Sequence, residues 1–540
     1  WDLGELLGAC LDTPIDATMG KRGRDEEVGS GTGVYGLSPA EPADEVRVKT
    51  AFAYRRHLNQ RFLEDLQRKI SADPFCWLEK EAESYKKHAR EIRDEFKDVS
   101  HAMERASAAV SLVAGAEEKQ GRCFVFGTGD GGQLGLGDDV FELLRPRLLD
   151  TVVPAGLPVL KVACGGMHTL AIVQGGLVYS WGVNDEGVLG RRANKDEPEA
   201  ESKPAPVNLG SKAAVDLSTG DSHAAVVTAD GCIMAWGTFR TSSGLYAFTP
   251  EGEQICRNPQ TRYAPDSDAG RATAVASGTD HILALTKAGD VYSWGCGEKG
   301  RLGRLVEKDA DNINKRDVEA KTKLLKPAKV PNLPSGVTSV VAGSYHCFAI
   351  AASSDGSRSE VFGWGLNSYG QLGIPYDFSM PASSQLVYFP KRVDELCGKK
   401  FVAGDGGENH TLMLSASGDV YSCGRSAYGR LGLPSIDPND DEPHSDLGHV
   451  TGVTDAVAVV AGGSTSGAVT ASGEAYVWGY GDLGQLGRGE DQSDAMTPVA
   501  LAKTKKMGGD RISALSFGGQ HAALVCLPSD SEARAAKRAR

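Results

Sequence analysis

Most of the chain after residue 119 alternates between short apolar runs and turns that contain glycine. A typical unit reads His168–Val173, then Gly175 and Gly176, then Leu177–Trp181. Two short apolar runs separated by a glycine turn predict a β-hairpin. The pattern continues almost to the end of the chain, so the sequence predicts an all-β domain over residues 119–528.

A longer repeat is superimposed on these hairpins. An aromatic residue, or once a cysteine, is followed by glycine and then by Gly-x-Leu-Gly, at intervals of 55 to 70 residues. The copies begin at Phe126, Trp181, Trp236, Trp294, Trp364, Cys423 and Trp478. A repeat of this length with four predicted strands per copy is typical of a β-propeller, in which only short, protected strand edges remain. The seven copies predict seven blades.

The third copy departs from this pattern. After Trp236 and Gly237 the chain continues as Thr238–Gly244, and no Leu-Gly follows in register. Because the other copies keep the motif, the departure is not a requirement of the fold. We therefore expect the functional site in the third blade.

A second motif fixes the register and predicts how the ring closes. Most copies carry a histidine ahead of the repeat residue, namely His168, His223, His281, His346 and His410. Thr465 takes this place in the last copy. Phe126 has no such motif ahead of it, whereas His521 has no Trp-Gly after it. The two halves are expected to complete one blade and to close the propeller with both chain ends.

The regions outside the repeats differ in character. Residues 1–44 are polar and rich in glycine, which predicts a disordered tail, and Met19 within it resembles a natural start. Residues 45–112 predict a helical extension, with an apolar heptad seam from Leu78 to Met103. The seam either packs on a neighbouring helix or on the propeller, or it mediates self-association or partner docking. Residues 529–540 form a basic tail.

Composition narrows the functional classes. A formal net charge of −13 argues against a general nucleic-acid binder. The eleven cysteines have no C-x-x-C spacing, which favours reduced thiols in an intracellular protein over a disulfide framework or a zinc site. No apolar run approaches the ~18 to 20 residues of a membrane span. Metal-ligand spacings, a nucleophile elbow and a dinucleotide fingerprint are also missing, so we expect no cofactor, no metal and no covalent chemistry.

The repeat motifs resemble a known family. Gly165–Thr169 followed by Trp181–Gly190 is similar to the family of the regulator of chromosome condensation. Many proteins share the bare repeat, so this match implies only the fold. Further segments, namely Gly127–Asp130, Gly220–His223, Ser277–His281, Gly295–Glu298 and the broken third copy, resemble the members that exchange guanine nucleotide on the small GTPase Ran.

The resemblance implies an exchange mechanism and the residues for it. An exchange factor must bind the nucleotide-free GTPase more tightly than the loaded one. In the family a wedge from the third blade displaces the phosphate-binding loops. The wedge corresponds here to Thr238, Phe239, Arg240, Thr241, Ser242, Ser243 and Gly244, with Arg240 at its tip. The carboxylates that take over the freed basic groups correspond to Asp130, Asp221 and Asp280.

Two of these aspartates stand just before a repeat histidine. The second blade has Gly166 and Met167 at the corresponding positions, so the repeat itself does not require an acid there. The alternative is that Asp221 and Asp280 each cap a strand turn.

The repeat histidines allow two interpretations. Six of the eleven histidines occupy the repeat position, which indicates that most are structural. The resemblance nevertheless places four residues, His168, His410, His521 and Arg304, at the partner surface. Two segments differ from the usual text of the family, namely Glu408-Asn409 before the sixth-copy histidine and Thr241–Ser243 in the wedge.

An insertion, Leu305–Lys329, follows the fourth copy. The resemblance implies that Lys315 and Arg316 within it bind the acidic surface of the histone dimer, where the arginine fork can pair with carboxylates in a bidentate manner. It also implies that other basic residues nearby contact DNA. The alternative is a solvated charged loop, since acidic residues are interspersed. The helical extension resembles part of a nuclear-basket nucleoporin that works with importin α, which implies a tether to the import machinery.

Two functions follow from these patterns. The first is a nuclear, chromatin-associated exchange factor for Ran. The alternative is a non-catalytic propeller scaffold at chromatin or at the nuclear pore.

Overall fold

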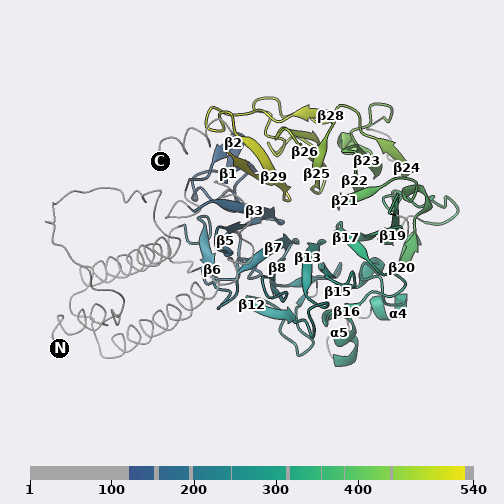
Figure 1. Cartoon of the computed structure of the whole chain (residues 1–540). Coiled ribbons are helices and arrows are strands. Elements are labelled where there is room, and N and C mark those ends of the chain that lie inside the picture. Colours follow the sequence, from purple (N-terminus) through teal and green to yellow (C-terminus); the bar gives the residue numbers. More distant parts are fainter. Residues whose placement is uncertain are drawn as a thin grey trace, which may run out of the picture. The chain divides into compact units, whose positions relative to one another are not determined.

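The computed structural model describes residues 121–150, 157–193, 199–244, 246–311, 317–353, 356–381, 384–437 and 442–528. These residues form seven four-stranded antiparallel sheets, arranged as blades around a ring (Figure 1). The predicted seven-bladed all-β propeller is confirmed. The predicted tail over residues 1–44, the helical extension over 45–112 and the basic tail over 529–540 lie outside the described residues.

We number the blades in the order of the sequence repeat and list the strands of each blade from the ring axis outward. The first blade comprises β29 (Arg511–Phe517), β30 (His521–Leu527), β1 (Arg122–Thr128) and β2 (Glu142–Leu148). The second comprises β3 (Val159–Cys164), β4 (His168–Val173), β5 (Leu177–Gly182) and β6 (Ala205–Val207). The third comprises β7 (Ala214–Thr219), β8 (His223–Thr228), β9 (Ile233–Gly237) and β12 (Cys256–Tyr263). The fourth comprises β13 (Ala272–Ser277), β14 (His281–Thr286), β15 (Val291–Gly295) and β16 (Ala328–Lys329).

The remaining blades follow the same order. The fifth comprises β17 (Val337–Ala342), β18 (His346–Ala352), β19 (Ser359–Leu366) and β20 (Leu386–Arg392). The sixth comprises β21 (Phe401–Gly406), β22 (His410–Ser415), β23 (Val420–Gly424) and β24 (His444–His449). The seventh comprises β25 (Ala456–Ala461), β26 (Thr465–Thr470), β27 (Ala475–Gly479) and β28 (Ala495–Ala500). Short helices lie between strands, namely η1 (Glu298–Gly300), α4 (Glu307–Ala310), α5 (Val318–Leu325), η3 (Asp394–Leu396) and η4 (Ala427–Gly429).

The first blade is completed by both ends of the described chain. Strand β1 pairs with β30, with Phe126 opposite Ala522. The guanidinium of Arg122 forms an ion pair with the buried carboxylate of Asp510 across this junction. The predicted closure of the ring is therefore confirmed, and it joins segments that are almost 400 residues apart in sequence.

The repeat motif encodes contacts between neighbouring blades. The backbone carbonyl oxygen of the variable residue in Gly-x-Leu-Gly accepts a hydrogen bond from the tryptophan indole N–H of the next blade. Trp181 Nε1 donates to Gln133 O at 2.9 Å, Trp364 Nε1 to Arg301 O at 3.0 Å and Trp478 Nε1 to Arg430 O at 3.0 Å. Because a buried N–H must be paired, the motif and the tryptophan constrain each other.

The repeat histidines form a second set of contacts between blades. His346 Nε2 lies 2.8 Å from Thr411 Oγ1, His410 Nε2 lies 2.9 Å from Ser466 Oγ and His521 Nε2 lies 2.7 Å from Thr169 Oγ1. Glycine stands three residues before each of these histidines, as at Gly343 and Gly407, because a Cβ there would overlap the imidazole ring. Gly-x-x-His is thus a packing motif.

A candidate partner-binding site at the wedge of the third blade

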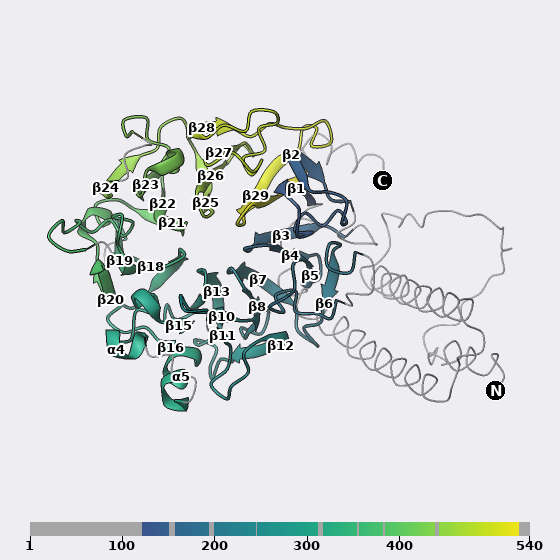
Figure 2. The ribbon, with the colours of Figure 1, turned by 180° about the vertical axis from the view of Figure 1, so that it is seen from behind.

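A small hairpin replaces the missing Leu-Gly of the third copy. Strand β10 (Phe239–Arg240) pairs with β11 (Tyr246–Ala247), and Figure 2 shows this hairpin next to β12 of the same blade. We call residues 238–247 the wedge. Its turn is closed by a hydrogen bond from Gly244 N to Thr241 O at 2.9 Å, and Gly244 has a φ of +74° that favours glycine.

The base of the wedge is buried. Thr238 Oγ1 donates to Gln254 O at 2.6 Å, and the Phe239 ring stacks on Phe248 with centroids 5.4 Å apart. These two side chains therefore anchor the wedge and are not themselves available to a partner, contrary to the assignment that the resemblance implied. Exposure begins beyond Arg240, at Ser242 and the residues that follow it.

Arg240 does not form the tip of the wedge, which corrects the expectation from the sequence. It lies in β10 opposite Tyr246, and the tip is the Thr241–Gly244 turn. The Arg240 guanidinium forms an ion pair with Asp221 and lies 3.9 Å from Glu186 Oε1. The backbone N–H of Arg240 donates to Asp280 Oδ1 at 2.7 Å. The wedge thus brings both predicted aspartates together.

The two aspartates occupy different environments. The side chain of Asp221 is 39% exposed, whereas that of Asp280 is 10% exposed. Burial raises the pKa of the Asp280 carboxyl, although the Arg240 N–H and the Arg301 charge offset part of this rise. Arg301 Nη1 lies 3.8 Å from Asp280 Oδ2. Asp280 therefore fixes the wedge from below, and Asp221 is the aspartate that a partner can reach.

Sequence reasoning did not assign a role to Arg301. Its guanidinium is buried, and its carbon Cζ lies 4.8 Å from the centroid of the Tyr345 ring. The available signal was its place in the fourth Gly-x-Leu-Gly, where three other copies have glutamine. A charged residue at a buried motif position indicates a buried acid nearby.

Glu298 was also missed as a site residue. Its carboxylate accepts hydrogen bonds from Ser242 N at 2.8 Å and from Ser242 Oγ at 3.0 Å. The acid belongs to η1 of the fourth blade, whereas the serine is in the wedge turn. The exposed turn is therefore held by a neighbouring blade as well as by its own base.

Asp130 lies apart from the wedge. It is exposed in the loop after β1 of the first blade, two blades away, and its Oδ1 accepts a hydrogen bond from Gln133 Nε2 at 3.1 Å. The structure thus groups two of the three predicted aspartates and leaves the third at a different part of the ring.

The predicted partner-surface histidines are inside the propeller. His168, His410 and His521 have exposed fractions of 0 to 1%. Burial lowers the pKa of His168 to about 3 and that of His521 to about 4, so both are neutral near pH 7. None of the three side chains reaches the surface, and we assign them to packing between blades in place of partner contact.

Arg304 also has a structural position. Its Nε donates to Ser293 Oγ at 3.0 Å, and its Nη2 lies 3.4 Å from the carbonyl oxygens of Leu324 and Lys326. Arg191 follows Leu-Gly in the second blade in the same way and donates to Ser180 Oγ at 3.1 Å. Two blades share the arrangement, so it belongs to the fold and not to a partner surface.

The insertion of the fourth blade packs beside the wedge. Asp317 caps α5 by accepting a hydrogen bond from Ala320 N at 3.0 Å. A cavity of about 250 Å³ lies between the wedge and α5, lined among others by Phe239, Tyr246 and Leu324. The predicted histone-binding residues Lys315 and Arg316 lie outside the described residues.

None of the helices within the described residues is long and apolar enough to cross a membrane. Within the same residues, His, Cys, Asp and Glu side chains form no group of three or more that would hold a metal ion.

The fold and the site define a class of protein, a closed seven-bladed β-propeller whose third blade carries a charged wedge. The model of the RCC1-like domain matches residues 122–524, and the chain belongs to this family. The family predicted from the repeat motifs is confirmed.

Several similar proteins cover most of the propeller. The human regulator of chromosome condensation is 36% identical over 412 residues, which span 75% of this chain and 90% of the relative. The guanine nucleotide exchange factor SRM1 of Saccharomyces cerevisiae is 31% identical over 442 residues, 74% of this chain and 85% of the relative. The crystal structure of S. cerevisiae Prp20p, described with its binding to Gsp1p and histones, has a TM-score of 0.67 at 30% identity and covers 78% of this chain and 95% of Prp20p.

Proposed function

We propose that this protein is a guanine-nucleotide exchange factor for the small GTPase Ran and that the wedge acts on the nucleotide site. Membership of the family alone does not carry this proposal, because one fold hosts many functions. The observation that carries it is the wedge itself, an exposed turn on a rigid, buried base. The exchange activity named for the yeast relative supports the same function.

The wedge suits displacement of a bound phosphate. A GTPase holds its nucleotide through a lysine-bearing phosphate loop and Mg²⁺. A factor that occupies the space of that loop binds the nucleotide-free form best, and the difference in affinity drives release. Ser242, Ser243 and Gly244 form the protruding part, and Glu298 holds the turn in place. A rigid wedge loses little conformational entropy on binding, so more of its contact energy acts on the partner.

Asp221 is suited to receive a basic group that the phosphate releases. Its carboxylate is paired with Arg240 in the free protein. Glu186 lies beside the same guanidinium and offers it an alternative carboxylate. When a partner lysine binds Asp221, Arg240 therefore keeps an acidic neighbour. Asp280 acts as a positioning residue, because it holds the Arg240 backbone and is nearly buried.

Chromatin binding and nuclear localisation are part of the same proposal. The histone binding described for Prp20p supports it. Lys315 and Arg316 are the proposed contacts, and reversal of both charges with Lys315→Glu and Arg316→Glu should weaken nucleosome binding while leaving nucleotide exchange unchanged. Unchanged nucleosome affinity in a binding titration would remove the histone contact. The link to importin α through the helical extension stays a prediction.

The affinity of the complex as a function of nucleotide tests the proposal against the scaffold alternative. Nucleotide-free Ran should form a complex with this protein that survives size-exclusion chromatography. Excess GDP or GTP should then dissociate it, because nucleotide and exchange factor compete in free energy for the same GTPase. A complex that is equally stable with and without nucleotide would support a scaffold and contradict exchange.

A further inference from the structure

Tyrosines line one arc of the ring beyond the wedge. Each lies in a loop just before a repeat histidine or just after the repeat Trp-Gly or Cys-Gly, as does the wedge itself. We call Tyr345, Tyr369, Tyr428 and Tyr480 the aromatic arc. It starts in the fifth blade, next to the η1 loop that holds the wedge, and ends in the seventh.

The arc is assembled from contacts between neighbouring loops. Lys299 Nζ lies 3.7 Å from the centroid of Tyr345, and Arg425 Cζ lies 4.8 Å from that of Tyr369. Tyr428 and Tyr480 meet edge to face with centroids 5.0 Å apart. These contacts join the loops of the fourth to the seventh blade into one surface.

Tyr428 has a backbone conformation that its side chain disfavours. Its φ is +63°, in the left-handed region that bulky residues rarely adopt. Lys299 holds the same place in the fourth-blade motif and has a φ of +61°. Strain of this kind is concentrated at functional sites.

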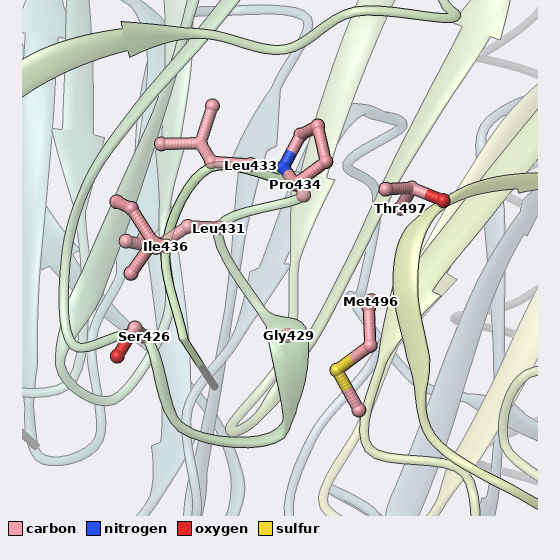
Figure 3. Close-up of a pocket in the computed structure, with 9 residues that line it drawn as sticks. Ser426, Gly429, Leu431, Leu433, Pro434, Ile436, Met496 and Thr497 are labelled. Carbon is pink, nitrogen blue, oxygen red and sulfur yellow. The ribbon is translucent and has the colours of Figure 1, made fainter. Parts of the chain in front are cut away.

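The strain at Tyr428 places its ring on the surface. Its side chain is 44% exposed even though it packs on Tyr480. The next residue, Gly429, lines a pocket of about 250 Å³ between the sixth and seventh blades. Figure 3 shows Gly429 between Ile436 and Met496, with Leu433 and Pro434 closing the pocket. An aromatic pair of one exposed and one half-buried tyrosine therefore lies next to an apolar cavity, to which Gly429 connects it.

We propose that the Tyr428–Tyr480 pair and the adjoining pocket are a second docking area for the GTPase, separate from the wedge. The inference rests on the proposed exchange function. The pair lies in the same type of loop as the wedge, and therefore at the same end of the strands, and the aromatic arc connects it to η1, which holds the wedge. Tyrosines at the surface beside an apolar pocket are typical of the residues that dominate binding energy at protein interfaces. The pocket receives an aliphatic or aromatic side chain of the GTPase.

The two docking areas have different kinetic roles. The wedge acts on the phosphate site and distinguishes loaded from nucleotide-free GTPase. The aromatic pair is distant from that site and contacts a surface that does not change with nucleotide. Contacts of equal strength in both states lower KM without changing kcat. The pair thus sets affinity for the GTPase, and the wedge sets the rate of release.

Steady-state GDP release from Ran, measured over a range of Ran·GDP concentrations, tests this separation. The Tyr428→Ala/Tyr480→Ala double variant should raise KM by about tenfold or more while kcat stays within about twofold, the effect of removing interface anchors that act equally in both states. Tyr428→Phe, which keeps the ring, should behave as the unsubstituted protein. Val457→Ala removes an apolar side chain that is 58% exposed near the start of β25, at the other end of the blade from these loops, and it should leave KM unchanged.

A glycine variant separates binding from folding. Tyr428→Gly removes the strain at φ of +63° and should keep or raise the melting temperature while it raises KM as alanine does. A rise in KM with a raised or equal melting temperature cannot come from unfolding. An unchanged KM in the double variant, with normal release by the unsubstituted protein, would overturn this inference alone. No release by the unsubstituted protein would overturn the proposed function and this inference with it.

Discussion

At the scale of single residues, the same side chain serves different purposes according to what surrounds it. Asp221 and Asp280 stand at nearly equivalent places before a repeat histidine, yet one is exposed beside Arg240 and the other is buried above Arg301. The sequence predicted that both matter because the second blade has Gly166 and Met167 at these places, so the repeat itself does not require an acid there. It did not distinguish contact from positioning, because the difference depends on Arg240 and Arg301, which come from other segments.

The buried histidines predict a loss of stability in acid. Burial lowers the pKa of His346 to about 3 in the folded protein, so between pH 6.5 and 3 the unfolded chain binds a proton that the folded chain does not. The free energy of unfolding therefore falls as pH drops through this window, and His346 contributes about 2 kcal/mol of the change between pH 7 and pH 5.

His346→Thr tests this, because Thr465 fills the same position in the seventh blade. The variant should be less stable than the unsubstituted protein at pH 7 by about 2 to 4 kcal/mol, owing to the cavity left by the ring. At pH 5 the gap should narrow by about 2 kcal/mol, because threonine does not titrate. Denaturant unfolding at the two pH values measures both gaps, and an equal gap would contradict the assignment of His346 as buried and neutral.

At the scale of elements, the wedge is the part of the structure that the sequence located but did not resolve. The missing Leu-Gly marked its position correctly. The strand pairing was not evident, because β11 and the Phe248 ring that packs on the base come from beyond the segment 238–244. The sequence therefore placed Arg240 at the tip, whereas the hairpin places it in a strand.

Glu298 gives a direct test of how the wedge is held. Glu298→Ala removes both hydrogen bonds to Ser242 and should slow GDP release by about tenfold or more, because small misplacements of an acting group are costly. Glu298 Oε2 also lies 3.9 Å from the buried Arg301 Nη2, so stability should fall by about 1 to 3 kcal/mol, and the release rate is compared at a temperature where both variants are folded. Glu319→Ala in α5, whose side chain is 84% exposed, is the matched control and should leave release unchanged. Equal release rates for the two variants would remove Glu298 from the site.

At the scale of the whole molecule, the sequence predicted the architecture of the described propeller, seven four-stranded blades closed by both ends of the described chain. The repeat motif specifies contacts that each blade makes with the next, through the indole N–H and the imidazole ring. A blade such as the fifth supplies a donor to the preceding blade and an acceptor to the following one, so a series of such blades can close into a ring. The sequence did not predict which repeat residues are buried by the neighbouring blade, and His168, His410 and His521 are examples. The exposure of a side chain depends on the closed ring and cannot be read from a single repeat.

Closure of the ring by both chain ends predicts a strong dependence on the last strands. A chain that ends after Asp510 lacks β29 and β30, the inner half of the first blade. Its melting temperature should fall by at least roughly 10 °C, because β1 loses its partner and the inner strands on either side lose their neighbour. A chain that ends at Pro528 keeps both strands and should melt as the full protein does. Calorimetry of the two truncations measures this, and equal melting temperatures would contradict closure by β30.

The most direct test of the whole account is GDP release from Ran with catalytic amounts of this protein and of its Asp280→Asn variant. The protein should accelerate release at substoichiometric concentration. Asp280→Asn should slow that release by about tenfold or more. The substitution removes the carboxylate charge that lies beside Arg301, and Asp280 is the residue that positions the wedge through the Arg240 N–H. Asp290→Asn, at an exposed ion pair with Lys329 in the same blade, should match the unsubstituted protein. A folded protein that leaves the release rate unchanged, or equal rates for both variants, would contradict exchange through the wedge.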